Sequence, residues 1–240
     1  MIKCIKSLIS AIVNKIRVFN HDRVLKSTNP KKIFTTVYKN QMWGPADFNS
    51  GYASTNKLIL KSWANSVIKF LKKINPQPKI LVDFGCGNFN VGNLIYKNFS
   101  TYIACDVVVD CIKRNKKKYS KLNNVEFKSL DVSKDKLPKG DMAIIRLVLQ
   151  HMTNFQILKF LIKLRSFKYI IVTEYIFDNK FKFMPNLDQR AGALSRRWRN
   201  PRSFVDITCA PFNFKFKSKK IINQSKDPEG AIQTIAYTLF

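Results

Sequence analysis

The sequence predicts an α/β fold with a mostly parallel sheet of seven strands, helices on both faces and an antiparallel hairpin at one edge. Three observations predict it. Short apolar segments alternate with segments of helical periodicity up to about residue 175, a glycine-containing loop follows the first of these strands, and the last two apolar segments have no helix between them. The chain has 240 residues, of which 45% are hydrophobic, and this is enough for one large domain with a buried core.

Five segments have the length and apolar composition of strands that are buried on both faces of a parallel sheet. They are 80–82, 101–106, 125–131, 141–148 and 168–174. Apolar residues recur at helical spacing in three of the segments between them, 91–99, 111–121 and 153–164. Thr153 or Asn154 is the expected N-cap of the last of these helices. A further helix is expected over 57–74, before Asn75-Pro76.

The C-terminal part of the chain predicts the edge hairpin. The apolar segments 212–216 and 231–240 are separated by the turn-forming sequence Asp227-Pro-Glu-Gly230. We therefore expect residues 57–240 to form the main domain. Residues 1–56 are expected to form an N-terminal part, with an amphipathic helix and an irregular connection from residue 20 to about residue 57.

The expected N-terminal helix covers residues 2–19, where Lys and Arg interrupt apolar residues at helical spacing. Such a helix lies in an anionic membrane interface or packs against the domain or a partner, and the sequence leaves both open. No stretch reaches the ~18–20 uninterrupted apolar residues that a membrane-spanning helix needs. We therefore expect a cytoplasmic protein, with peripheral membrane contact through residues 2–19 as the open alternative.

The charge balance favours anionic partners. Lys and Arg total 43 against 15 Asp and Glu, so the formal net charge is +28. A surplus of this size attracts nucleic acid, anionic lipid or phosphorylated substrates without choosing among them. The five cysteines form no CxxC pair and the chain has only two histidines, so no metal site is predicted and the thiols are expected to be free.

A loop with the pattern Asp83-x-Gly85-x-Gly87 directly follows the first predicted strand. Glycines allow a sharp turn and a close approach of the backbone to a ligand. Asp106 ends the second strand, where it can accept hydrogen bonds from ribose hydroxyls, and Asp131 ends the third, where it can accept one from an adenine amino group. Because ligands of open α/β sheets bind at the carboxyl ends of the strands, these residues together predict a nucleoside pocket.

A dinucleotide such as NAD is the nearest alternative ligand. Its fingerprint is Gly-x-Gly-x-x-Gly, and here Phe89 and Asn90 leave the third glycine absent. A pyrophosphate would lose its close approach to the backbone, whereas a sulfonium nucleoside has no phosphates to place.

Residues 57–175, with the loop at 80–87 and the acids that follow, resemble the class I S-adenosylmethionine-dependent methyltransferases. The resemblance implies a Rossmann-like sheet and S-adenosyl-L-methionine as cofactor. It implies that the glycine loop contacts the methionine moiety, that Asp106 holds the ribose and that Asp131 faces the adenine. Phe89 replaces the usual third small residue of the loop.

Further segments resemble a bacterial subgroup of these enzymes that is associated with surface-glycan and secondary-metabolite loci. They are Trp43-Gly44, Ser50-Gly51, 146–152, Thr173-Glu174, Asp206-Ile-Thr and Pro211-Phe-Asn213.

Methyl transfer is an in-line displacement that needs alignment, and a hydroxyl acceptor also needs a base. His151, after the fourth strand, and Glu174, at the end of the fifth, are the candidate bases. The alternative for His151 is a hydrogen bond to the backbone at a helix start. Arg146 and Gln150 are expected to contact the cofactor or the substrate.

The segment 190–202 contains five arginines around Trp198. Arginine binds phosphates and carboxylates in a bidentate manner, and Trp can stack on a base or a sugar. We therefore expect Arg190, Arg197, Trp198 and Arg199 to bind an anionic acceptor. A solvated basic loop is the alternative.

The sequence thus predicts a methyltransferase for a glycan, a sugar phosphate or another small anionic acceptor. Oxygen is the expected acceptor atom, because Arg146-Leu-Val-Leu stands where amino-methylating enzymes carry a proline motif, and the chain has no Pro-Cys pair for cytosine methylation. An RNA methyltransferase, favoured by the charge of +28, and a non-catalytic S-adenosylmethionine-binding or scaffold protein are the alternatives.

Overall fold

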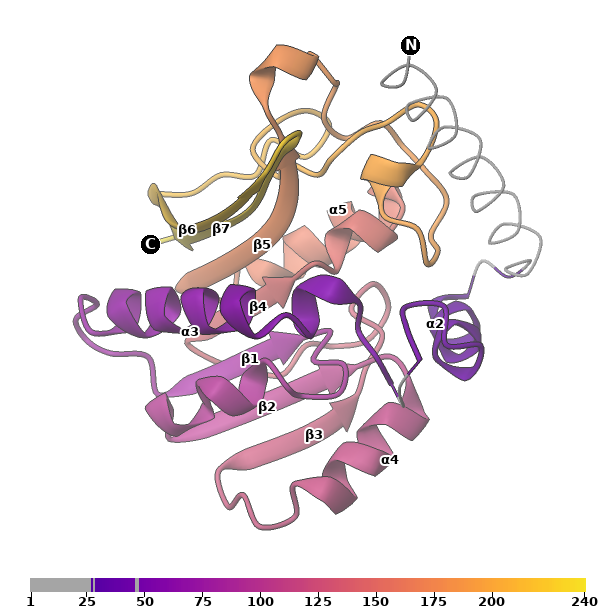
Figure 1. Cartoon of the computed structure of the whole chain (residues 1–240). Helices are drawn as coiled ribbons and strands as arrows, with labels where there is room; N and C mark the ends of the chain where they lie inside the picture. Colours follow the sequence, from indigo (N-terminus) through magenta and orange to yellow (C-terminus); the bar gives the residue numbers. More distant parts are fainter. Residues whose placement is uncertain (1–26, 28, 46–47) are drawn as a thin grey trace.

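The computed structural model describes residues 27, 29–45 and 48–240 (Figure 1). The amphipathic helix predicted over residues 2–19 lies outside them, so its contacts stay a prediction. Within the described part of the chain, no helix is long and apolar enough to cross a membrane.

The sheet has seven strands in the order β3-β2-β1-β4-β5-β7-β6 (Figure 1). The first five strands pair in parallel, whereas β7 is antiparallel to both β5 and β6. Because the order reverses between β1 and β4, the carboxyl ends of these strands border a crevice where ligands of such sheets bind. This arrangement confirms the predicted fold class. The strands are β1 (Ile80–Phe84), β2 (Thr101–Asp106), β3 (Val125–Ser129), β4 (Met142–Arg146), β5 (Tyr169–Phe177), β6 (Ser218–Asp227) and β7 (Gly230–Thr238).

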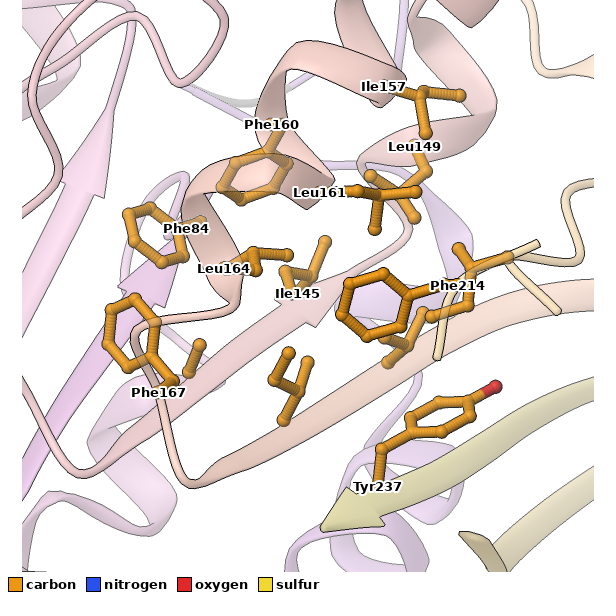
Figure 2. Close-up of a cluster of buried hydrophobic side chains, with 14 of the residues drawn as sticks. Phe84, Ile145, Leu149, Ile157, Phe160, Leu161, Leu164, Phe167, Phe214 and Tyr237 are labelled. Atoms are coloured by element: carbon orange, nitrogen blue, oxygen red, sulfur yellow. The ribbon is translucent and has the colours of Figure 1, made fainter. Parts of the chain in front are cut away.

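Apolar residues cover both faces of the sheet. On one face, α5 (Asn154–Leu164) buries Ile157, Phe160 and Leu164 against strand residues such as Ile145 (Figure 2). On the other face, α3 (Lys57–Leu71) and α4 (Val109–Lys118) bury residues such as Trp63 and Ile112.

Local capping explains where α5 begins. The Thr153 hydroxyl accepts a hydrogen bond from the Gln156 N–H, and the Gln156 side chain accepts one from the Thr153 N–H. This reciprocal pair satisfies two donors at the helix start. Of the two N-caps predicted, Thr153 is the one observed.

The segment 91–99 was expected to be a helix and is instead two 3-10 turns, Gly92–Leu94 and Tyr96–Asn98. The prediction was wrong because the chain folds tightly over the buried ring of Phe89. A Cβ atom on Gly92 would lie 2.3 Å from that ring.

The connection predicted between residues 20 and 57 contains a helix, α2 (Pro30–Lys39), so its irregular assignment was wrong in this part. The Asn29 side chain caps the helix by accepting a hydrogen bond from Lys31 N–H at 3.0 Å. Ile33 and Val37 are buried against Ala191 and Ala193, which pins α2 to the main domain. Sequence reasoning missed this helix although Ile33 and Val37 lie one helical turn apart. The boundary expected after residue 56 coincides with the start of α3.

The hairpin is confirmed, but its first strand was misplaced. The apolar segment 212–216 is not a strand: Phe212 and Phe214 are buried in the core that α5 covers. The strand is the polar segment β6, which lies at the outer edge of the sheet. An edge strand with largely exposed side chains lacks the apolar pattern that identifies strands in a sequence. The other predicted elements differ from the observed ones only at their ends.

Candidate active site

A cavity of about 540 Å³ opens at the carboxyl ends of β1, β2 and β4. Residues from 30 to 54 form one wall and residues 193–198 form another. Three of the predicted carboxylates, those of Asp83, Asp106 and Asp131, line it together. The structure therefore places these three acids and the two walls around the same cavity.

The glycine loop bends sharply into this cavity. Gly85 and Gly87 have φ angles of 81° and 51°, in the left-handed region that glycine adopts without steric cost. The N–H groups of Gly85 and Cys86 donate to the Cys105 carbonyl at 2.8 and 2.9 Å, which ties the loop to β2. A Cβ atom on Gly85 would lie 2.3 Å from Cγ2 of Val148. Gly85 is among the residues that line the described part of the cavity, and Gly87 is not.

Asp106 lies at the tip of β2 and is 8% exposed. Its two carboxylate oxygens accept hydrogen bonds from Gly87 N–H at 3.0 Å and Val108 N–H at 2.9 Å. Burial raises the pKa of Asp106, and these backbone donors oppose the rise. Because a carboxylate has about four acceptor positions, Asp106 retains acceptor capacity toward the cavity.

Asp83 lies at the end of β1, where Tyr102 donates a hydrogen bond to it at 2.9 Å. Burial raises the pKa of Asp83 to about 7, with Asp106 adding to the rise and Tyr102 and Arg146 opposing it. A cation bound beside this carboxylate would favour its charged form.

Asp131 follows β3 and lines the cavity with its neighbours Leu130 and Val132. One of its oxygens accepts hydrogen bonds from the N–H and the hydroxyl of Ser133, at 3.0 and 2.7 Å. These bonds orient the carboxylate at the third strand end, and its contact with adenine stays a prediction.

Arg146 lines the cavity at the end of β4, but its donors face the chain rather than open space. Its guanidinium donates to the Ser54 hydroxyl at 3.1 Å and to the Ala53 carbonyl at 2.8 Å, and lies over the Trp63 ring. Burial lowers the pKa of Arg146 to about 10. These hydrogen bonds link the end of β4 to residues 53 and 54 in the cavity wall. The cofactor-binding role of Arg146 stays a prediction.

His151 lines the cavity in the loop after β4. Its Nδ1 lies 2.9 Å from the Gly192 carbonyl oxygen, which can only accept, so Nδ1 carries the proton. Burial lowers the pKa of His151 to about 4. The ring is therefore neutral at neutral pH, with a lone pair on Nε2.

Glu174 was predicted as a second candidate base, but it is 3% exposed and absent from the described lining of the cavity. Its Oε1 accepts a hydrogen bond from Leu149 N–H at 2.8 Å. Burial raises the pKa of Glu174 to about 8. Glu174 therefore lies under the loop after β4 and stabilises that loop through this hydrogen bond. It is not placed to act as a base toward an acceptor in the cavity.

The arginines of segment 190–202 mostly bind the protein itself. Arg196 is 1% exposed and donates to the carbonyls of Leu187 and Met152. Arg197 pairs with Asp227 at 3.0 Å and with Glu229 at 3.2 Å. The sequence does not reveal these ion pairs, because both acids lie about thirty residues from Arg197. Asp227 ends β6, and Glu229 lies in the turn before β7.

Among the residues predicted to bind the acceptor, Arg197 and Trp198 line the cavity, whereas Arg190 and Arg199 are absent from its described lining. Arg190 and Arg199 each interact within the protein. Arg196, Arg197 and Arg202 thus bind carbonyl and carboxylate groups of the protein, and binding of an anionic acceptor by this segment stays a prediction.

An aromatic cluster that the sequence only partly indicated forms part of the cavity wall. The Trp43 ring lies 5.2 Å from the His151 ring, 5.9 Å from Phe34 and 5.4 Å from Tyr38. Trp43 Nε1 also donates to the Ala193 carbonyl at 3.0 Å. Trp43 was noted in the sequence, but Phe34 and Tyr38 belong to α2, the helix that periodicity missed.

Metal ligands do not cluster in the part of the chain that the structure describes: no three His, Cys, Asp or Glu residues there could hold an ion together. The four described cysteines, Cys86, Cys105, Cys111 and Cys209, are free thiols.

No family model matches the sequence, and no curated protein matches it. Solved structures do match the fold. The methyltransferase domain of bacterial CtHen1 is 18% identical, with a TM-score of 0.54 over 75% of this chain and 98% of that chain. The N-methyltransferase NodS from Bradyrhizobium japonicum, in complex with S-adenosyl-L-homocysteine, is 9% identical, with a TM-score of 0.60 over 85% of this chain and 98% of that chain.

The N-terminal domain of EvdMO1, solved with S-adenosyl-L-homocysteine and D-fucose, is 12% identical, with a TM-score of 0.56 over 75% of this chain and 84% of that chain. Identities this low concern architecture alone. The chain therefore has the Rossmann-like fold of the S-adenosylmethionine-dependent methyltransferases.

Proposed function

We propose that this protein is an S-adenosyl-L-methionine-dependent methyltransferase for a small acceptor. One observation carries the proposal: a glycine bend and the carboxylates of Asp83, Asp106 and Asp131 line a single cavity at adjacent strand ends. Three carboxylates favour a cation and disfavour phosphates, so the cavity suits a sulfonium nucleoside better than a dinucleotide. The ligands in the NodS and EvdMO1 structures support the same assignment.

Each carboxylate has a distinct task in this proposal. Asp106 accepts hydrogen bonds from the ribose hydroxyls with the lone pairs that Gly87 and Val108 leave free. Asp131 faces the adenine, and Asp83 lies beside the methionine moiety next to Gly85. When bound, the cofactor supplies an electrophilic methyl group. The chain's own residues then need to exclude water and align an acceptor.

The acceptor in this proposal is a small molecule with a hydroxyl group on a ring. Phe34, Trp43, Tyr52 and Trp198 give the acceptor side an aromatic lining on which a sugar or another ring can pack. Its cations are already engaged, Arg197 by Asp227 and Glu229 and Arg146 by residues 53 and 54. A neutral ring therefore fits this wall better than the anionic acceptor expected from the arginine-rich sequence. The EvdMO1 structure, solved in the presence of D-fucose, supports a sugar as the first candidate.

His151 is the proposed base. Its Nε2 carries a lone pair and no proton because Nδ1 donates to Gly192, and its ring lies against Trp43 on the acceptor side. With a pKa of about 4 the ring is too weak a base to remove the hydroxyl proton in advance. It accepts that proton while the new bond between the oxygen and the methyl group forms. Gln150 Nε2 donates a hydrogen bond to this lone pair at 3.3 Å and orients the ring. In the proposed reaction the acceptor hydroxyl takes the place of Gln150 at Nε2.

Calorimetry with S-adenosyl-L-homocysteine tests the cofactor assignment. We expect binding to the wild-type chain and a loss of tenfold or more in Asp106→Asn, because a hydrogen bond to a charged group contributes about 1.5–3 kcal/mol. Asp110→Asn removes the same charge from an exposed position on α4 and is the matched control. If the wild-type chain gives no binding heat, or both variants bind alike, the proposed pocket is wrong.

Product analysis tests the acceptor. The protein is incubated with methyl-labelled cofactor and a panel of neutral sugars, sugar phosphates and RNA, and the products are identified by mass spectrometry. Methylated neutral sugar is the expected result. Labelled nucleosides would instead favour an RNA methyltransferase, and cofactor binding without product from any acceptor or from a cell extract would favour a non-catalytic binding protein.

A further inference from the structure

A second concave site lies on the far side of β3 from β2, away from the aromatic acceptor wall. It is a groove of about 630 Å³ between α4, β3 and residues 136–138 of the loop that joins β3 to β4. Figure 1 shows α4 running beside β3 at this edge of the sheet. Four lysines line the groove, Lys113 and Lys116 from α4, Lys128 from β3 and Lys136 from the loop.

The positive charge of this groove is largely uncompensated. All four lysine side chains are exposed. Lys128 pairs with Glu126 at 2.8 Å, but both groups are about half exposed (47% and 54%), so solvent weakens the pair. Lys113, Lys116 and Lys136 have no ion-pair partner among the residues that the structure describes. Like charges gathered in one concavity attract a multivalent anion.

We propose that this groove, which we call the lysine groove, binds the phosphate backbone of single-stranded nucleic acid. The shape favours a strand over a membrane, because lysines from α4 lie on one side and those from β3 and the loop on the other. A strand in the groove meets both sides, whereas the surface of a bilayer meets only the rim.

Recognition in the lysine groove is independent of base sequence. Single-strand sites that hold bases use exposed aromatic rings as stacking surfaces. The aromatic residue of this groove, Phe127, is 6% exposed and belongs to the core. Phosphate contacts alone then supply the affinity, which makes binding strongly dependent on salt.

The lysine groove adjoins the proposed cofactor cavity but is a separate site. Leu130 lines both, so the two meet at the end where Asp131 lies. No lysine of the groove lines the described part of the cavity. Nucleic-acid binding therefore does not depend on the methyltransferase assignment, and the two can be tested apart.

The experiment measures binding of a fluorescent 20-nucleotide poly(U) probe to the full chain as a function of salt. The test variant replaces Lys113, Lys116, Lys128 and Lys136 with Gln. The control variant replaces four exposed lysines of α3 or its end with Gln, at Lys61, Lys69, Lys72 and Lys73, and so has the same net charge. About three to four lost phosphate contacts should reduce the slope of log affinity against log salt by about 2–3 in the test variant only. This corresponds to weaker binding by tenfold or more at low salt.

Two further readouts complete the test. Acetylation of the groove lysines by a soluble reagent, read by mass spectrometry, should fall when the probe is bound. Urea unfolding should give the same midpoint, to within the effect of four surface substitutions, for both variants, which shows that they are folded whether or not the cofactor binds. Equal slopes for the two variants, unprotected groove lysines, or stronger binding of poly(Glu) or phosphatidylglycerol vesicles than of poly(U) through these lysines would overturn the proposal.

Discussion

The carboxyl group of Glu174 accepts a 2.8 Å hydrogen bond from the backbone N–H of Leu149, so β5 holds the loop that carries His151. That loop begins at Leu147, which has a φ angle of 56°, in a region that few residues other than glycine adopt. Glu174 thus stabilises a strained turn next to the cavity, and we regard it as a positioning residue for His151.

We expect Glu174→Gln to change how stability depends on pH. Burial raises the pKa of Glu174 to about 8 in the folded chain. A carboxyl group with a raised pKa favours the folded state while it is protonated there, and this contribution is lost as the pH rises to the folded value. Between about pH 4.5 and 8, the wild-type free energy of unfolding should fall relative to that of the variant, by at most about 1.4 kcal/mol per pH unit.

Urea unfolding across this pH range measures the Glu174 effect. Glu126→Gln changes an exposed carboxyl group of β3 and should leave the pH dependence unchanged. A wild-type chain and a Glu174→Gln variant with parallel profiles would mean that Glu174 is ionised throughout.

Gly85→Ala should destabilise the fold for two separable reasons. Its φ angle of 81° costs an L-residue about 1–2 kcal/mol, and its Cβ would lie 2.3 Å from Cγ2 of Val148. Gly51→Ala also changes a glycine of positive φ (83°, with ψ 172°), and nothing lies within 4 Å of its Cβ, so it shows a backbone cost without a steric clash. Adding Val148→Ala to Gly85→Ala should recover the steric part in thermal unfolding. No recovery would mean that the backbone angle accounts for the whole loss.

His151 should titrate far below an ordinary imidazole. The chain has two histidines, so proton NMR resolves both rings, and His151→Gln identifies which signal belongs to His151. We expect a pKa of about 4, because burial disfavours the charged ring. A value near 6.5 would show that the ring is open to water and would weaken its proposed place on the acceptor wall.

The ion pairs of Arg197 should contribute modestly to stability. Arg197 is 16% exposed at its side chain, its partner Glu229 is 34% exposed, and Arg197 also lies 3.6 Å from the centre of the Tyr175 ring. A double-mutant cycle with Arg197→Met and Glu229→Gln should give a coupling energy of about 1 kcal/mol that falls in high salt. The same cycle on Lys128 and Glu126 should give a coupling energy near zero, because both groups are about half exposed. Equal coupling in the two cycles would contradict this account.

The elements that sequence reasoning located correctly have their causes within a few residues. The central parallel strands, such as β4, carry apolar residues on both faces, and the Thr153 and Gln156 side chains form a local cap. Asp83, Asp106 and Asp131 were found because strand ends in such a sheet converge on one edge. The elements that it missed depend on distant partners. Helix α2 is defined by its contact with Ala191 and Ala193.

The acceptor side shows the same limit. Arginine-rich sequence predicted an anion site, yet Arg197 is neutralised by Asp227 and Glu229. Likewise, Glu174 has the chemistry of a base, and only its burial beneath the loop shows that it contacts the backbone instead. Residue type limits what a side chain can do, but folding decides which of these uses remains available.

Two adjacent peptide groups connect the shape of the acceptor wall to the proton chemistry proposed there. Trp43 Nε1 donates to the carbonyl of Ala193, and His151 Nδ1 donates to that of Gly192. Remodelling residues 192 and 193 to accommodate a different molecule would shift the Trp43 indole. It would also disturb the carbonyl that accepts the Nδ1–H hydrogen bond and so fixes the tautomer of His151. Attempts to engineer acceptor preference through residues 192 and 193 will therefore alter turnover together with selectivity.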